Sequence, residues 1–81
     1  MTRKQYERMA TNFSQFAGMM VPYRVQNPYK DNPFHRSYGE EYLTYFGQLW
    51  GVGIGANTES MIITKDGHKY AIHFKDITWP L

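Results

Sequence analysis

The chain has 81 residues, of which 42% are hydrophobic and 17% aromatic, with nine Lys and Arg against seven Asp and Glu and no cysteine. This length predicts a single domain over residues 1–81 with a small core, because a domain of this size buries only about 60% of its unfolded surface. The lack of cysteine excludes a disulfide-stapled secreted scaffold and favours the cytoplasm, and a formal charge of +2 is too small to indicate a dedicated nucleic-acid binder.

A first helix is predicted over residues 3–18. Thr2 and Gln5 have the spacing of a capping box, in which each side chain satisfies a backbone amide at the start of a helix. Gly18 and Pro22 disfavour continuation of the helix, so it is expected to end between them. Apolar side chains recur between these limits at steps of three and four residues, as on one face of a helix: Tyr6, Met9, Ala10, Phe13, Phe16, Ala17 and Met20.

Residues 22–38 form a long connection with three prolines. The pairs Asn27-Pro28 and Asn32-Pro33 favour turns or extended backbone. Residues 23–25 are a candidate for a third, short edge strand of the sheet, although the flanking prolines limit its hydrogen-bonded ladder.

A second helix is predicted over residues 38–50. Ser37 and Glu40 repeat the capping-box spacing, and Gly51 stands where a helix commonly ends on a glycine. The apolar face of this helix would comprise Tyr42, Leu43, Phe46, Leu49 and Trp50.

A β-hairpin is predicted over residues 61–74, because Asp66-Gly67 is a type I′ turn sequence between β-branched and aromatic residues. The turn sets Lys65 opposite His68 and Ile63 opposite Tyr70. One face of the hairpin is then apolar and needs a cover, which the two amphipathic helices supply. The predicted fold class is therefore α+β, with two helices packed on a small antiparallel sheet. The expected core comprises Phe13, Phe16, Phe46, Leu49, Ile63 and Ile72.

No catalytic, cofactor or metal motif is present in the sequence. Gly51, Gly53 and Gly55 follow a predicted helix and precede a strand, the reverse of a phosphate-binding loop. His68 and His73 are an odd number of residues apart on one strand, so they point to opposite faces of the sheet. We therefore expect a protein that is not an enzyme and that holds neither cofactor nor metal.

The candidate binding residues lie in and beside the long connection, where aromatic rings alternate with cations. They are Tyr23, Arg24, Tyr29, Lys30, Phe34 and Arg36. Three interpretations of this mixture remain open: the rings fill the core and anchor the loop, they form a protein interface, or they stack on nucleic-acid bases. Either binding interpretation requires at least one of the rings to be exposed.

The functional prediction is a non-enzymatic protein-binding module or inhibitor that uses this stretch, with the tail at Trp79 as an additional contact. The alternative is a nucleic-acid-binding accessory domain, and self-association through exposed sheet edges is a third candidate. A short, tyrosine-rich chain without a catalytic set is similar to small phage or mobile-element proteins that act on a host protein complex. No stretch reaches the roughly 20 apolar residues of a membrane span, so no membrane partner is expected.

Overall fold

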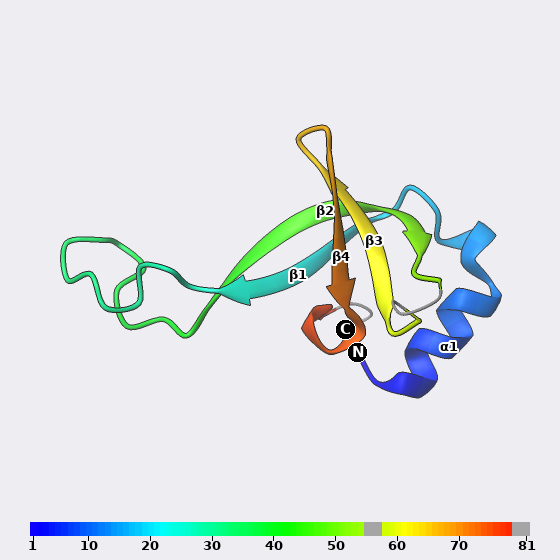
Figure 1. The fold of residues 1–81 in the computed structure, drawn as a ribbon, viewed down its shortest axis with the longest axis horizontal. Coiled ribbons are helices and arrows are strands. Elements are labelled where there is room, and N and C mark those ends of the chain that lie inside the picture. Colours follow the sequence, from blue (N-terminus) through cyan, green and yellow to red (C-terminus); the bar gives the residue numbers. More distant parts are fainter. Residues whose placement is uncertain (55–57, 79–81) are drawn as a thin grey trace.

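The computed structural model describes residues 1–54 and 58–78 as one helix packed against a curled antiparallel sheet (Figure 1). The four strands follow one another in the order β1-β2-β3-β4, and each pairs with the next. The α+β class is therefore confirmed. The elements are α1 (Arg3–Thr11), the 3-10 helix η1 (Phe13–Gln15), β1 (Met20–Gln26), β2 (Tyr42–Val52), β3 (Ser60–Lys65), β4 (His68–His73) and the 3-10 helix η3 (Phe74–Asp76).

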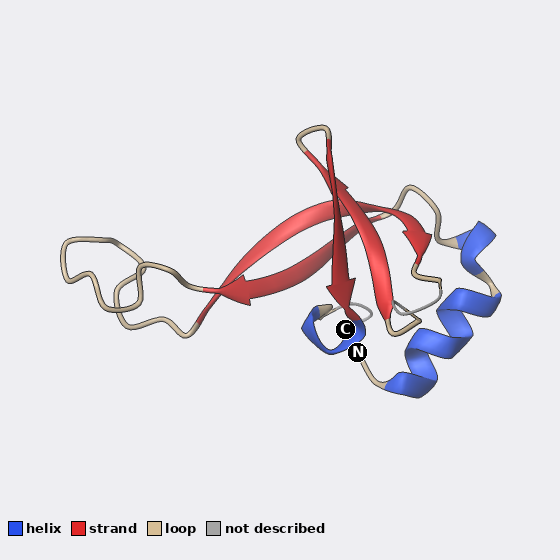
Figure 2. Ribbon diagram, viewed as in Figure 1, coloured by secondary structure: helices blue, strands red, loops and turns tan. Residues whose placement is uncertain are grey.

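The sheet curls until its two ends meet. After β4, η3 turns the chain back so that Ile77 forms a bridge with Tyr23 of β1 and the amide of Thr78 donates to the carbonyl of Pro22 at 3.1 Å. Figure 2 shows the strands crossing steeply as they curl. The side of the sheet turned toward the core, here called the inner face, carries Val21, Tyr23, Val25, Leu43, Tyr45, Gly47, Leu49, Val52, Met61, Ile63, Lys65, His68, Tyr70 and Ile72.

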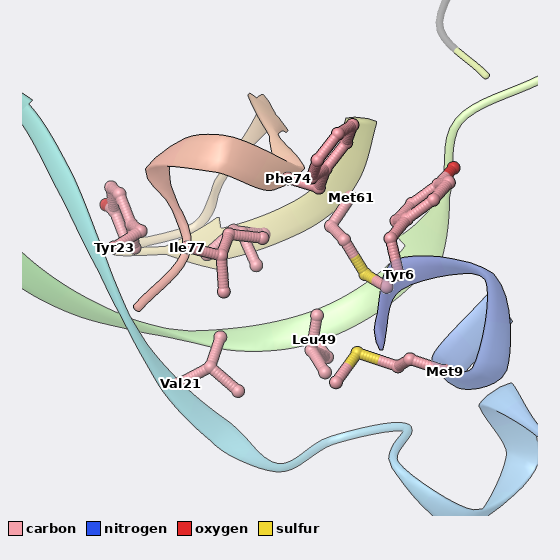
Figure 3. Close-up of a cluster of buried hydrophobic side chains, with 9 residues drawn as sticks. Tyr6, Met9, Val21, Tyr23, Leu49, Met61, Phe74 and Ile77 are labelled. Atoms are coloured by element: carbon pink, nitrogen blue, oxygen red, sulfur yellow. The ribbon is translucent and has the colours of Figure 1, made fainter. Parts of the chain in front are cut away.

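The core fills one end of the inner face. There the helix α1 contributes Tyr6 and Met9, which lie against Leu49 and Met61 (Figure 3). Because α1 is the only α-helix among the described residues, the part of the inner face that lies beyond α1 and the 3-10 helix η3 has no helical cover. The buried cluster comprises Tyr6, Met9, Val21, Tyr23, Leu49, Met61, Ile63, Phe74 and Ile77.

The predicted helix over residues 38–50 is wrong, because this stretch contains the long strand β2. Its apolar residues fit both a helical and an alternating pattern, but Tyr, Thr, Phe and Trp favour strands, and Gly47 would weaken a helix interior. Because side chains alternate along a strand, Phe46 lies on the outer face of the sheet, which is the side opposite the inner face. It is 56% exposed there and is not in the core as predicted. Leu49, in contrast, is buried as predicted.

The first helix begins as predicted and ends early. Thr2 and Gln5 form the capping box, but α1 stops at Thr11 rather than at residue 18. The Thr11 hydroxyl donates to the carbonyl of Glu7, and the Asn12 side chain donates to that of Arg8. Side chains that bond to carbonyls one turn back compete with helix continuation, and the chain passes into η1.

The hairpin is confirmed with the predicted register, including Ile63 opposite Tyr70 and Lys65 opposite His68. Asp66 and Gly67 both have positive φ, at 53° and 78°, as a type I′ turn requires. Tyr70 lies on the same face as the buried Ile63 but is itself 44% exposed, since α1 does not reach it. The candidate strand over residues 23–25 is confirmed as the middle of β1. The expected contact at Trp79 lies outside the described residues.

Candidate functional site

Residues 27–41, here called the connecting segment, link β1 to β2 and project away from the sheet (Figure 1). The projection makes the molecule elongated, with a long axis of 44 Å and two short axes of 26 Å. Four of the six predicted binding residues lie in this segment: Tyr29, Lys30, Phe34 and Arg36.

A single buried amide, that of Asn27, fixes the base of the connecting segment. Its side-chain nitrogen donates to the carbonyls of Ser37 and Glu40 at 2.8 and 2.9 Å, and its side-chain oxygen accepts from the amide of Tyr29 at 2.9 Å. Asn27 and Ser37 are the only buried polar residues among those described. A buried polar group that makes all of these bonds ties both ends of the segment together.

Two Asn-Pro turns set the path of the segment. The Asn27 side chain accepts from the amide of Tyr29, and the Asn32 side chain accepts in the same way from the amide of Phe34 at 3.0 Å. Proline at the middle position fixes one backbone angle of each turn. Each turn therefore presents an aromatic residue directly after its proline.

The two presented aromatics have different surroundings. Tyr29 stacks on His35, with ring centroids 3.9 Å apart and an angle of 6° between the planes. Phe34 is 97% exposed. The requirement that at least one ring be exposed is therefore met at Phe34, which carries the largest exposed fraction of any apolar side chain described.

The charges of the connecting segment are mostly acidic. Lys30 and Arg36 are its cations, and its carboxylates are Asp31, Glu40 and Glu41, so its formal charge is −1. Lys30 forms an ion pair with Glu41, and the hydrogen bond in this pair raises the pKa of Lys30. Arg36 is exposed and has no ion-pair partner within the described part of the chain.

The other two predicted residues belong to the sheet. Tyr23 is 3% exposed and part of the core cluster, since it lies on the inner face of β1. Arg24 lies on the opposite face, with Nε 3.5 Å from a carboxylate oxygen of Asp76 and its guanidinium 4.5 Å from the ring centroid of Tyr42. The structure therefore does not bring these two residues into the connecting segment.

Sequence reasoning overlooked two features. The role of Asn27 could have been suspected, because it precedes a proline and Asn side chains often bond two residues ahead. The second feature is an aromatic outer face of the sheet, where Phe46 and Trp50 are more than half exposed and the Lys69 ammonium lies 3.6 Å from the Trp50 ring centroid. This face was hidden by the helical assignment of β2.

A charged cluster fastens α1 to the sheet. Glu59 pairs with Arg3 of α1 and with His73 Nε2 at 3.0 Å. The hydrogen bonds from His73 and then Arg3 lower the pKa of Glu59. The Arg3 guanidinium also lies 5.3 Å from the ring centroid of Phe74. Each group has a partner from another element, so the cluster acts as a structural clamp.

Comparison with known proteins gives no functional lead, because no protein-family model, curated protein or solved structure matches the chain. Over residues 1–54 and 58–78, no group of three or more His, Cys, Asp or Glu side chains is arranged to hold a metal ion. No helix in these ranges is long and apolar enough to cross a bilayer.

Proposed function

We propose that the chain is a non-enzymatic protein-binding module or inhibitor that inserts Phe34 of the connecting segment into a pocket of its partner. The observation that carries this proposal is the 97% exposure of Phe34 on a segment whose base is tied by a buried Asn27. Exposing a phenylalanine side chain to water is unfavourable. The exposed ring of Phe34 contributes nothing to the core of this chain. On binding, such a ring buries a large apolar area.

The fixed backbone of the segment supports the same proposal. The Asn32 turn sets the backbone at Phe34, and the amide of Gly39 donates to the carbonyl of Lys30 at 2.9 Å across the segment. A segment that is ordered before it meets its partner loses less conformational entropy on binding. Arg36, which has no ion-pair partner in the described ranges, supplies a cation two residues from Phe34, and arginine is enriched at protein interfaces.

Charge favours a protein over a nucleic acid as the partner. Affinity for nucleic acid depends on cations that neutralise phosphates, whereas the connecting segment has a formal charge of −1 and one of its two cations is paired with Glu41. One face of the Tyr29 ring is already stacked on His35 and so is not available to a base. A cytoplasmic host protein complex, as expected for a small phage or mobile-element protein, is our proposed partner class.

The experiment that tests the partner class has two steps. The partner is first captured on this chain from a nuclease-treated extract of the cells that produce it. The affinity of the captured partner for the chain is then measured at several salt concentrations. We expect the captured partner to be a protein, and its affinity to change little between 50 and 200 mM salt, because an aromatic anchor needs no counterion release. A loss of capture on nuclease treatment, together with a fall in affinity of about 1000-fold over that salt range, would show a nucleic-acid partner instead.

A further inference from the structure

A cavity of about 330 Å³ lies on the inner face, where α1 does not cover it. Its walls come from all four strands, so it occupies the concave side of the curled sheet. This volume is at the lower end of the range for small-molecule sites, which is about 300 to 1,000 Å³. The lining side chains are Tyr23 and Val25 of β1, Tyr45 of β2, Lys65 of β3 and Tyr70 and Ile72 of β4.

The phenol hydroxyls that line this cavity are not hydrogen-bonded within the part of the chain that the structure describes. Within the described residues, no hydrogen bond involves the hydroxyl of Tyr23, Tyr45 or Tyr70, and Lys65 forms no ion pair. The Tyr23 residue is 3% exposed, but its hydroxyl is not among the buried side-chain atoms that lack a partner, so it is open to the cavity. Burial, followed by the neighbouring Tyr70 and Tyr45, raises the pKa of Tyr23, so its hydroxyl remains a donor at neutral pH.

The sign of the charge at the cavity selects the ligand. Lys65 is the only charged side chain in the lining, and its ammonium lies 5.1 Å from the ring centroid of Tyr45. The carboxylate of the neighbouring Asp66 also acts on Tyr23, but it is not part of the lining. This ammonium already occupies a face of Tyr45 and would repel a second cation. An anion, in contrast, would find an ammonium and phenol donors beside an apolar wall formed by Val25 and Ile72.

We propose that this cavity binds a small hydrophobic carboxylic acid, with its apolar body against Val25 and Ile72 and its carboxylate paired with Lys65. A small acid fits better than a protein segment because the site is a hollow of limited volume rather than an extended groove. The site is separate from the connecting segment, so its occupancy does not depend on Phe34.

The test uses three probes of similar size on the full chain: 2-naphthylacetate, its neutral amide and the cationic 2-naphthylethylamine. Binding is followed by NMR through the methyl signals of Val25 and Ile72. We expect the acid to bind with a dissociation constant of about 1 mM or lower. A binding free energy of about −0.3 kcal/mol for each of about 14 non-hydrogen atoms corresponds to this value. The acid should bind at least tenfold more tightly than the amine, with the amide between them.

Three variants assign the effect to the cavity. Lys65→Met keeps the apolar stem and should bring the affinities of acid and amide close together, whereas Lys69→Met, on the opposite face, should leave their ratio unchanged. Tyr70→Phe should weaken the acid more than the amide, and it serves as the test if Lys65→Met does not fold. The proposal is overturned by equal binding of the three probes, by no saturable binding, or by methyl shifts outside the cavity. Binding of a free-acid peptide ending in Phe, without binding of naphthylacetate, would also overturn it.

Discussion

A Cβ atom added to Gly47 would lie 2.3 Å from Cγ2 of Ile63. The same atom would lie 2.9 Å from the carbonyl oxygen of Thr64 and 3.3 Å from Cε1 of Tyr23. Glycine at this position therefore lets β1 and β3 close over β2, and the curl of the sheet depends on it.

Replacing Gly47 with alanine should destabilise the protein, because the backbone oxygen of Thr64 cannot move aside as a flexible side chain can. Overpacking of this kind costs about 1 to 3 kcal/mol, which urea unfolding would measure. Gly51→Ala in the same strand is the matched control, since its Cβ would meet only Ile62 at an ordinary 3.9 Å. Equal stabilities of the two variants would show that the inner face is packed less tightly than described.

Truncating two apolar residues of β2 tests which of its side chains face the core and which face outward. Leu49→Ala should lower the free energy of unfolding by about 2 to 5 kcal/mol, because the side chain is 2% exposed in the core. Phe46→Ala should cost much less, since the ring is more than half exposed on the outer face. Thermal melts of both variants compare the two losses, and the opposite order would contradict the facing of β2 described here.

Local signals in the sequence predicted the parts of the fold that short-range chemistry determines. The capping box at Thr2 and the Asp66-Gly67 turn each depend on residues close in sequence, and both are confirmed. The helix predicted over residues 38–50 is wrong because the apolar spacing there suits two periods, and the choice between them is made by the pairing of β2 with β1 and β3.

The candidate site was predictable in part, for a similar reason. The exposed ring of Phe34 and the free charge of Arg36 lie where the sequence showed an unusual mixture of aromatic and basic residues. The burial of Tyr23 follows from its inward position in β1, and the pairing of Arg24 with Asp76 depends on the return of the chain after β4. The inner-face cavity could not be foreseen, because the predicted second helix would have covered it.

The clamp at Glu59 should make stability depend on pH in the acid range. His73 and Arg3 lower the pKa of Glu59 in the folded state, so the carboxylate is favoured by folding. Its contribution is therefore fully present above the unfolded-state pKa of about 4.3 and is lost as the pH falls through the lower folded-state value. Melting temperatures measured between pH 6 and 3 should fall less steeply for Glu59→Gln than for the unmodified chain.

Glu7→Gln is the control for this experiment, because the Glu7 side chain is exposed on α1 and forms no ion pair among the described residues. The melting temperature of this variant should follow the parent curve. If Glu59→Gln also follows the parent curve, the clamp does not contribute to stability.

Asn27 should control the order of the connecting segment. Asn27→Ala removes the side-chain bonds to Ser37, Glu40 and Tyr29. Leaving such buried groups unpaired costs about 1 to 3 kcal/mol, and hydrogen exchange of the Tyr29 amide should become faster. Asn32→Ala, at the exposed second turn, should affect the Phe34 amide alone. Unchanged exchange at Tyr29 in Asn27→Ala would mean that the segment is held by other contacts.

The role of Phe34 is tested most directly by the affinity of the purified partner protein for the unmodified chain, Phe34→Ala and Phe46→Ala. Both variants truncate an exposed phenylalanine, but Phe34 lies on the connecting segment and Phe46 on the outer face of the sheet. Truncation of a central anchor costs about 2 kcal/mol or more, so Phe34→Ala should bind roughly 30-fold more weakly at an unchanged melting temperature, while Phe46→Ala stays within about twofold. Wild-type affinity of Phe34→Ala would contradict the proposed function.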